Sequence, residues 1–307
     1  MNVLITSVGT ATSVNLIKEL KKRNHYIVGV DINDYGYTAG SLMVDNYIKV
    51  PLAISENFSA IIKKIIVDNN IELLIPINDV EVEILSKEKE FIGCKCILPD
   101  INTISIFRNK LISALKMDEI GIDVPAILEA DDITKKRILK KKVSVGSKGI
   151  TIYEKGISCK IDKDEVLQEF VDGVEYTVDV LSGLDGSPYY IIPRERLETK
   201  SGVATKVRIR EDKNIIQLVK KILKNYPIPG FCNVQFIKNE DHIWFVEVNT
   251  RFSGCGIASV ITAPEMIDTF LDISRNITIN RSLNEGVKWN GVVTRYYEEK
   301  VFYENIS

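Results

Sequence analysis

The chain has 307 residues, of which 45% are hydrophobic and 27% charged, with a formal net charge of −2. This composition is typical of a globular protein long enough for two or three domains. The slightly negative charge argues against a nucleic-acid or membrane-surface partner. No apolar run approaches the roughly 18–20 residues that cross a bilayer, and the start MNVLITSVGTATS lacks the pattern of a signal peptide.

Cysteine and histidine usage narrows the chemistry. The five cysteines form no CxxC pair, and without an export signal they indicate reduced thiols in a cytoplasmic protein. Cys94 and Cys96 share one face of an expected strand, where core packing is favoured over metal binding. His25 and His242 neighbour no Ser- or Cys-centred nucleophile motif. Hydrolysis by a Ser–His or Cys–His pair is therefore disfavoured, and the chemistry must rely on carboxylates, amides, lysines and arginines.

Strand and helix patterns alternate over residues 1–100. Apolar runs such as VLITS, YIVGVDI and IELLIPI predict strands, and amphipathic stretches such as FSAIIKKIIVDNN predict the helices between them. This alternation is typical of βαβ units in a parallel sheet, so we expect a Rossmann-like domain. The turn SVGTATS holds Gly9 but not the full G-x-G-x-x-G fingerprint, so dinucleotide binding is the weaker interpretation there.

A basic segment and a small-residue loop follow. The stretch NKLISALKMDEIGIDVP predicts a helix that ends at Gly121, and six of the eight residues 135–142 are basic. The loop VSVGSKG comes next, in which Gly146 and Gly149 allow positive φ and a close approach of backbone N–H groups to an anion. A lysine-bearing strand that leads into such a loop suits a phosphate, although a plain hairpin turn fits the same residues.

From residue 168 onward the pattern is that of antiparallel strands. The segment QEFVDGVEYTVDV predicts two strands around the turn at Asp172 and Gly173. In PRERLETKSGVATKVRI, Arg194 and Arg196 share one strand face, and Lys206 follows a turn.

The segment GFCNVQFIKNEDHIWFVEVNTRFSG predicts a hairpin. Its first strand places Asn233 and Gln235 on one face, and its second places Glu247, Asn249 and Arg251 on one face. If the two faces coincide, they present amides, a carboxylate and a guanidinium in one patch, but the register does not follow from the sequence. A solvated edge, a buried structural ion pair and a metal–phosphate site all fit the second strand taken alone.

Together these segments resemble the ATP-grasp ligases. The similarity is to the ATP-binding halves of the carbamoyl-phosphate synthase large chain and to related carboxylate–amine ligases, and it extends over nearly the whole chain. It implies an α/β and α+β fold: a Rossmann-like parallel-sheet domain followed by two α+β subdomains that clasp the nucleotide. The implied divisions are residues 1–100 for the first domain, 101–167 for the subdomain with the phosphate loop, and 168–307 for the subdomain with the adenine hinge and metal site.

The segment FVEVNTRFSG is similar to the metal-binding strand of this family, which has the pattern E-I-N-x-R-x-S-G. The match implies that Glu247 and Asn249 ligate Mg²⁺, with Gln235 as a further residue on the metal side. It implies that Arg251 faces the γ-phosphate or the reacting centre. Oxygen ligands of this kind suit Mg²⁺ without excess negative charge against ATP.

The nucleotide-binding residues are implied in the same way. QEFVDGVEYTVDV is similar to the adenine hinge of the family, so the backbone of Glu169, Phe170 and Val171 would meet the adenine edge, and Glu175 would take the ribose hydroxyls. Lys110 and Lys140 match two phosphate-side lysines of the family. The loop VSVGSKG is similar to the flexible phosphate loop, and the residues implied there are Gly146, Ser147 and Gly149.

The resemblance implies ATP and Mg²⁺ as cofactors, with Mn²⁺ as an alternative ion, and a small carboxylate and an amine as substrates. The carboxylate would attack the γ-phosphorus to give an acyl phosphate and ADP, and the amine would then displace phosphate. Besides Arg251, three basic residues are candidates for binding the carboxylate or the transferred phosphate: Arg194, Arg196 and Lys206. Surface ion pairing with Glu195 and Glu198 is the alternative for those three.

Three other functions remain open at this stage. One is phosphorylation of a carboxylate or of bicarbonate without ligation, as in carbamoyl-phosphate synthase. The second is an ATP-binding module with impaired catalysis. It is suggested by the short segment 149–168 and by departures from the family at the loop, where Ser144 and Val145 stand in place of small Gly/Ser residues and Lys141 in place of a proline. The third is an NAD-dependent oxidoreductase built on the N-terminal domain. The sequence leaves the oligomeric state open, a homodimer included.

Overall fold

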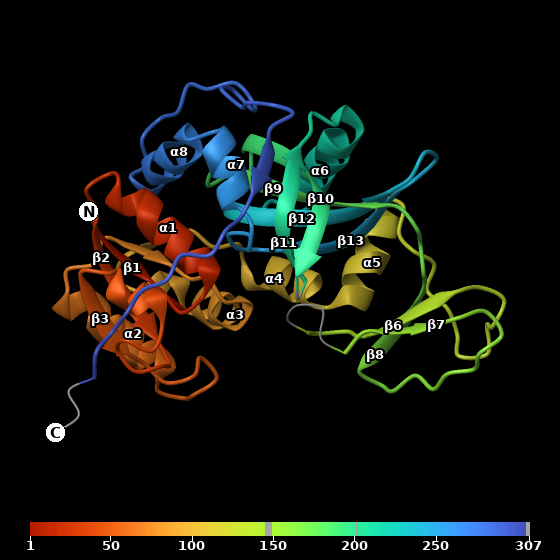
Figure 1. Cartoon of the computed structure of the whole chain (residues 1–307), viewed down its shortest axis with the longest axis horizontal. Helices are drawn as coiled ribbons and strands as arrows, with labels where there is room; N and C mark the ends of the chain where they lie inside the picture. Colours follow the sequence, from red (N-terminus) through yellow and green to blue (C-terminus); the bar gives the residue numbers. More distant parts are fainter. Residues whose placement is uncertain (145–148, 201, 305–307) are drawn as a thin grey trace.

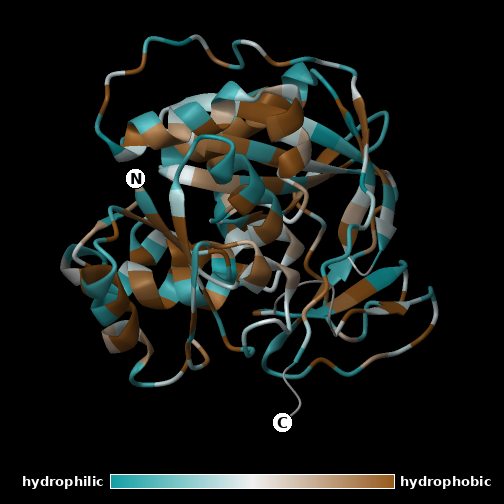
Figure 2. Ribbon diagram, turned by 60° about the vertical axis from the view of Figure 1, so that its left-hand side comes forward, coloured by the Kyte–Doolittle hydropathy of each residue, from teal (hydrophilic) through white to brown (hydrophobic). Residues whose placement is uncertain are grey.

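The structure, a computed structural model, describes residues 1–144, 149–200 and 202–304 of the chain. Within these residues the chain forms a parallel sheet, a small antiparallel sheet and a large antiparallel sheet, with helices packed between and around them (Figure 1). Hydrophobic residues gather on the strands and helices in the middle of the molecule (Figure 2). None of the helices in the described ranges is long and apolar enough to span a membrane. The combination of parallel and antiparallel sheets confirms the predicted fold class.

The parallel sheet forms from the apolar runs near the N-terminus. Its strands are β1 (Asn2–Ile5), β2 (Tyr26–Asp31), β3 (Asn46–Lys49), β4 (Leu73–Ile75) and β5 (Lys95–Cys96). Its helices are α1 (Ala11–Lys21), α2 (Phe58–Asp68) and α3 (Asp79–Lys87), with the short 3₁₀ helices η1 (Ala39–Leu42) and η2 (Lys89–Phe91). The strands pair in the order β3-β2-β1-β4-β5, so the predicted Rossmann-like arrangement is confirmed.

The start of α3 matters for the site described below. The Asn78 side chain accepts a hydrogen bond from the Val80 N–H, and the Glu81 carboxylate accepts one from the Asn78 N–H, which is a capping box. This cap places Asp79 at the first residue of the helix, just beyond β4. The carboxyl ends of parallel strands meet at this edge, which is where ligands bind in open α/β sheets.

Two helices and the small sheet come next. The helices are α4 (Ile101–Arg108) and α5 (Lys110–Glu119), and the strands are β6 (Arg137–Lys141), β7 (Thr151–Tyr153) and β8 (Glu165–Glu169). The strands are antiparallel in the order β7-β6-β8. The Asn109 side chain caps α5 by accepting from the N–H groups of Leu111 and Ile112. The Lys110 N–H donates to the Lys142 carbonyl at 2.7 Å, which joins the start of α5 to the end of β6.

The rest of the chain forms the large sheet and three helices. Its strands are β9 (Val174–Ser182), β10 (Pro188–Lys200), β11 (Val203–Ile209), β12 (Gly230–Lys238), β13 (Ile243–Asn249) and β14 (Val292–Thr294). They are antiparallel in the order β13-β12-β9-β10-β11-β14. The helices are α6 (Lys213–Asn225), α7 (Ile257–Thr262) and α8 (Glu265–Ser274). Buried residues of α6 recur at helical spacing, from Ile215 to Leu223, and pack on the sheet.

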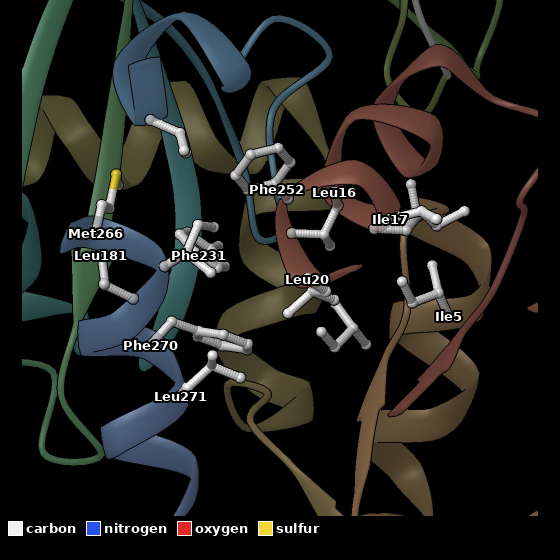
Figure 3. Packing of buried hydrophobic residues seen from close by; sticks show 14 of the residues in the cluster. Ile5, Leu16, Ile17, Leu20, Leu181, Phe231, Phe252, Met266, Phe270 and Leu271 are labelled. Atoms are coloured by element: carbon white, nitrogen blue, oxygen red, sulfur yellow. The ribbon is translucent and has the colours of Figure 1, made fainter. Parts of the chain in front are cut away.

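One hydrophobic cluster joins the parallel sheet to the large sheet. Leu16 and Leu20 of α1 belong to the same buried cluster as Phe231, Phe252 and Phe270 (Figure 3). The Phe231 ring lies 4.9 Å from Phe252 and 4.6 Å from Phe270, between ring centroids. Burial of each such side chain contributes about 1.5–3 kcal/mol. The N-terminal domain is therefore held against the large sheet, and residues from both meet at the site.

Candidate active site

The pairing of β12 with β13 answers the question of register. Asn233 lies opposite Asn249, and Gln235 lies opposite Glu247, so the polar residues of the two strands share one face. The Gln235 Nε2 donates to the Glu247 Oε1 at 2.9 Å, and the Asn249 Nδ2 donates to the same oxygen at 3.1 Å. The predicted patch of amides around one carboxylate is therefore assembled.

The patch has the donor set that suits a hard divalent cation. Because Gln235 and Asn249 each use the amide nitrogen on Glu247, the amide oxygen of each remains to accept or to ligate. Asn249 is held further by a hydrogen bond from its Nδ2 to the Asn233 Oδ1 at 3.2 Å. Mg²⁺ takes oxygen ligands and commonly uses one or two carboxylates with phosphates and water. One carboxylate with two amide oxygens fits that chemistry.

Two lysines face the same carboxylate. The Lys110 Nζ lies 3.7 Å from the Glu247 Oε2 and donates to the Ser144 Oγ at 3.1 Å. Lys140 of β6 is 8% exposed, and burial lowers the pKa of its ammonium to about 8. The Glu247 carboxylate opposes this fall in pKa, whereas the positive charge of Lys110 adds to it. Both lysines therefore lie within electrostatic reach of Glu247, as a phosphate-binding role requires.

A polar pocket opens at this point. Six of its lining residues carry polar side chains that bear on the site: Asp79, Arg108, Lys110, Ser144, Glu247 and Asn249. They come from the start of α3, the junction of α4 with α5, the residues after β6, and β13. Asp79 and Arg108 were not predicted from the sequence. A usable signal for Asp79 existed, because it follows the strand IELLIPI at the carboxyl edge of a parallel sheet.

Arg251 pairs with Asp79 rather than with Glu247. The Arg251 Nε donates to the Asp79 Oδ1 and the Nη2 donates to the Asp79 Oδ2, each at 3.1 Å. The Arg251 Nη1 donates to the Phe252 carbonyl at 3.2 Å. The side chains are 19% and 7% exposed for Arg251 and Asp79. The guanidinium is therefore in contact with the N-terminal domain through Asp79, which lines the pocket, whereas Arg251 itself is not among the lining residues.

Arg194 lies on the same sheet face as the patch but in the core. It pairs across the strands with Thr177, which pairs with Gln235, which pairs with Glu247. The Arg194 guanidinium donates to Asp179 at 2.6 and 3.0 Å and to the Ser253 Oγ at 2.9 Å. Its side chain is 1% exposed and is absent from the pocket lining. Its predicted catalytic role stays a prediction.

The other two basic candidates are paired at the surface. The Arg196 Nη1 lies 2.6 Å from the Glu175 Oε2, and the Lys206 Nζ lies 3.1 Å from the Glu198 Oε2. Neither Arg196 nor Lys206 lines the pocket. For Lys206 the partner is one of the two glutamates that the sequence offered as the alternative. The geometry favours ion pairing for these two residues, and their substrate-binding role stays a prediction.

The predicted adenine hinge joins the small sheet to the large one. Glu169 ends β8, and its carboxylate lies 2.8 Å from the Lys135 Nζ. The Phe170 N–H donates to the Lys136 carbonyl at 2.9 Å, and the Lys136 ammonium lies 4.7 Å from the centre of the Phe170 ring. A nucleotide bound along this segment would contact both sheets.

The predicted phosphate loop is described at its two ends, residues 143–144 and 149. Gly149 adopts a φ of +73°, as expected from the sequence for a turn in which glycine is favoured. The predicted contacts of Gly146 and Ser147 lie outside the described residues.

Two family models match the chain. Residues 107–255 match the model of the ATP-grasp domain, and residues 3–97 match that of the PylC-like N-terminal domain. Residues 107–255 therefore form a domain of the ATP-grasp family. In this chain the ATP-grasp domain follows a PylC-like N-terminal domain, and the resemblance identified from the sequence is confirmed.

Several solved structures share the fold. The biotin carboxylase domain of 2-oxoglutarate carboxylase from Hydrogenobacter thermophilus, crystallised with MgADP, ADP and bicarbonate, has a TM-score of 0.75 at 16% identity, covering 95% of this chain and 73% of that one. N5-carboxyaminoimidazole synthetase from Staphylococcus aureus has a TM-score of 0.71 at 13% identity, with coverages of 91% and 78%. L-amino acid ligase from Bacillus licheniformis has a TM-score of 0.70 at 14% identity, with coverages of 89% and 74%. At these identities the likeness shows the fold alone. No curated protein sequence matches the chain.

Proposed function

We propose that this protein is an ATP- and Mg²⁺-dependent ligase that activates a small carboxylate as an acyl phosphate for attack by an amine. The observation that carries the proposal is the patch on β12 and β13. There Gln235 and Asn249 donate hydrogen bonds to Glu247. The Lys110 ammonium lies 3.7 Å from the Glu247 Oε2, and Lys140 of β6 lies within electrostatic reach of the same carboxylate. One carboxylate that accepts from two amides and has two ammonium groups within electrostatic reach suits a metal nucleotide better than a structural ion pair.

Each group has a distinct task in this proposal. Glu247, with the amide oxygens of Gln235 and Asn249, would hold Mg²⁺. A bound Mg²⁺ supplies positive charge that neutralises the phosphate oxygens. Lys110 and Lys140 bind the phosphates as point charges, because an ammonium on a flexible stem follows an oxyanion without a fixed geometry.

The nucleotide base is assigned to the segment between the two sheets. The backbone of Glu169, Phe170 and Val171 meets the adenine edge, and the Glu175 carboxylate accepts from the ribose hydroxyls. Glu175 is exposed and paired with Arg196 in the ligand-free protein, so it must exchange that partner for the ribose. Gly149 is proposed to contact the phosphates, and Gly146 and Ser147, proposed for the same task, lie outside the described residues.

The chemistry is a phosphoryl transfer followed by an acyl transfer. A carboxylate oxygen forms a bond to the γ-phosphorus as the bond from that phosphorus to the bridging oxygen breaks, and ADP leaves. The amine nitrogen then attacks the acyl carbon, the bond from carbon to the phosphate oxygen breaks, and the nitrogen loses a proton. Arg251 stabilises negative charge at the transferred group, because a guanidinium donates two parallel hydrogen bonds to an oxyanion. Arg194, Arg196 and Lys206 are proposed for the substrate carboxylate.

The comparisons support the class of reaction. Proteins of the same fold include an L-amino acid ligase and a biotin carboxylase domain crystallised with MgADP and bicarbonate. The bicarbonate complex favours one second candidate, which is phosphorylation of a carboxylate or bicarbonate without ligation. Loss of catalysis with retained ATP binding is the remaining alternative.

A screen of ADP release tests the proposal. Amino acids and sugar acids are offered with MgATP, each with and without a panel of amines, and with EDTA as the metal-free control. A ligase releases ADP with a carboxylate and forms an amide product when the amine is added. ADP release that no amine converts to product supports the phosphorylation candidate. Tight ATP binding in calorimetry, with no ADP release from any pool, would show that catalysis has been lost.

A further inference from the structure

We propose that Asp79 of the N-terminal domain is a positioning residue for Arg251. Asp79 fixes the plane of the guanidinium and leaves two of its N–H groups for an oxyanion at the pocket. The inference rests on the proposed function in one respect: it takes Arg251 to be the group that meets the transferred phosphoryl oxygen.

The hydrogen bonds of Arg251 define this arrangement. A guanidinium has five N–H groups in one plane. Asp79 accepts from the Nε and from one N–H of Nη2, and the Phe252 carbonyl accepts from one N–H of Nη1. Each terminal nitrogen therefore keeps one further N–H. These two N–H groups can donate to oxygens of a carboxylate or phosphoryl group.

The fold explains why the acid stands at this place. The capping box of Asn78 and Glu81 fixes the start of α3, so the backbone that carries Asp79 is set by the N-terminal domain. The N-terminus of a helix also favours a negative charge. Asp79 lies 172 residues from Arg251 in sequence and lines the same pocket as Glu247 and Asn249. The N-terminal domain thereby reaches the reaction centre through one carboxylate.

The contact between Asp79 and Arg251 restricts the orientation of the Arg251 side chain. Arg251 follows the end of β13, outside the strand hydrogen bonds, and an arginine side chain has many rotamers. Two parallel bonds to Asp79 and one to a carbonyl select one of these rotamers. Misplacement of a catalytic group by 1 Å costs on the order of 10²-fold in rate. Loss of the Asp79 carboxylate should therefore lower turnover through the orientation of Arg251.

The chain contains a second inter-domain ion pair, more exposed than the first, that lacks this role. Arg23, two residues beyond the end of α1, donates through Nε and Nη2 to Asp268 of α8, at 2.6 and 2.9 Å. This pair also joins the N-terminal domain to the large-sheet part of the chain by a two-point bond, and neither residue lines the pocket. A variant of Asp268 therefore reports what the loss of an inter-domain ion pair does by itself.

The experiment compares Asp79→Asn with Asp268→Asn. Thermal unfolding, the KM for MgATP and the turnover per folded molecule are measured for both variants. We expect Asp79→Asn to lower turnover by about 10- to 100-fold with the KM within about threefold, because the orientation of one catalytic group is lost. Asp268→Asn should leave turnover per folded molecule unchanged. In an Arg251→Lys background, Asp79→Asn should have little further effect, since both act through one group. Turnover of Asp79→Asn equal to that of Asp268→Asn would overturn the inference.

A second measurement separates this inference from the proposed function. Inorganic phosphate is titrated by calorimetry into protein saturated with MgADP, which requires no knowledge of the carboxylate or amine. We expect Asp79→Asn to weaken phosphate binding by about tenfold without a change in MgADP affinity, the scale of one hydrogen bond to a charged group. Asp268→Asn should bind phosphate as the parent protein does. Equal phosphate affinity in the parent protein and Asp79→Asn, including no binding by either, overturns the inference. An inert parent enzyme in the ADP-release screen counts against the proposed function alone.

Discussion

The large sheet bears two arginines that each form a two-point bond with an aspartate, and their surroundings differ. Arg194 lies within β10, is 1% exposed, and pairs with Asp179 of the neighbouring strand. Arg251 follows β13, is 19% exposed, and pairs with Asp79 of another domain beside the pocket. An Arg–Asp pair with two hydrogen bonds thus occurs once inside the core and once at the edge of a site.

The difference indicates which arginine can meet a substrate. Arg194 uses its donors on Asp179 and Ser253, and its buried Nη1 has no hydrogen-bond partner among the described residues. Release of either member would leave a buried charge, which costs about 3–5 kcal/mol. Arg251 also keeps two N–H groups, but its side chain is 19% exposed, so these groups can meet a ligand. Pairing and the number of remaining donors therefore say little about function, whereas exposure says more.

The largest expected effect comes from the carboxylate at the centre of the patch. Glu247→Gln keeps the shape of the side chain but removes the charge that a cation needs, so Mg²⁺-dependent ADP release should fall by roughly 10³-fold. The melting temperature should change little, because Glu247 is partly exposed and accepts from amides that can also pair with Gln. Glu119→Gln, in an exposed pair with Lys116, serves as the control. Near-normal ADP release from Glu247→Gln would show that Glu247 is not a metal ligand.

The comparison of the two arginines is tested by the same substitution in both. Arg251→Lys keeps the charge but loses the planar fork, so turnover should fall by about 10²-fold while ATP affinity stays within a few fold. Arg194→Lys should instead lower the free energy of unfolding by about 1.5–3 kcal/mol, the scale of hydrogen bonds to charged groups. Turnover per folded molecule then decides. A destabilised Arg251→Lys with a normal rate, or a stable Arg194→Lys with a slow one, would reverse the two assignments.

Part of the fold and of the site can be predicted from the sequence. The alternation of strand and helix patterns predicts the parallel sheet, because the two periods of side-chain burial differ. The face shared by Glu247 and Asn249 follows from the alternation of side chains along a strand. The register with Gln235 does not, because a period of two residues is compatible with several offsets of the partner strand.

Long-range ion pairs are the part that sequence reasoning missed. Arg194 and Arg196 have the same alternating pattern whether they face a substrate or a carboxylate of a neighbouring strand. Asp79 is 172 residues from Arg251, so nothing local in either segment indicates the pair. The resemblance to a family located the strand of the metal site. The partner of its arginine required the three-dimensional placement of the N-terminal domain.

A smaller effect is expected at the adenosine end of the site. Glu175→Ala should weaken ATP by about 1.5–3 kcal/mol, because a charged acceptor for the ribose hydroxyls is lost. The affinity for a 2′,3′-dideoxy analogue should change much less, since it offers no hydroxyls. Calorimetry with both nucleotides measures the difference. Equal losses for the two nucleotides would mean that Glu175 does not bind the ribose. Its ion pair with Arg196 would then be structural, like the pair of Arg194 with Asp179 on the same two strands.

The smallest effect concerns Lys140. This side chain is buried, as that of Arg194 is, but it interacts with the charges of Glu247 and Lys110 at the pocket. Its pKa is lowered to about 8 by burial, so the ammonium loses its proton as the pH rises through 8 in the ligand-free protein. Bound phosphates favour the charged form, so ATP binding above pH 8 must include the uptake of a proton. The apparent ATP affinity should therefore fall by about tenfold between pH 7 and pH 9.

The same shift predicts the opposite trend for the stability of the ligand-free protein. A lysine whose pKa is lower in the folded state than in the unfolded chain destabilises the fold while both forms are charged, and that cost disappears as the pH rises from about 8 towards the ordinary value of 10.5. The contribution of Lys140 to the free energy of unfolding should thus increase over the range in which ATP affinity decreases. Lys140→Arg keeps its charge throughout this range, so both trends should be absent from that variant. Calorimetry at pH 7, 8 and 9, in buffers of different ionisation enthalpy, counts the protons taken up. If the parent protein and Lys140→Arg lose ATP affinity in parallel, the titrating group is not Lys140. Lys140 would then be a buried structural residue, as Arg194 is, rather than a phosphate-binding group.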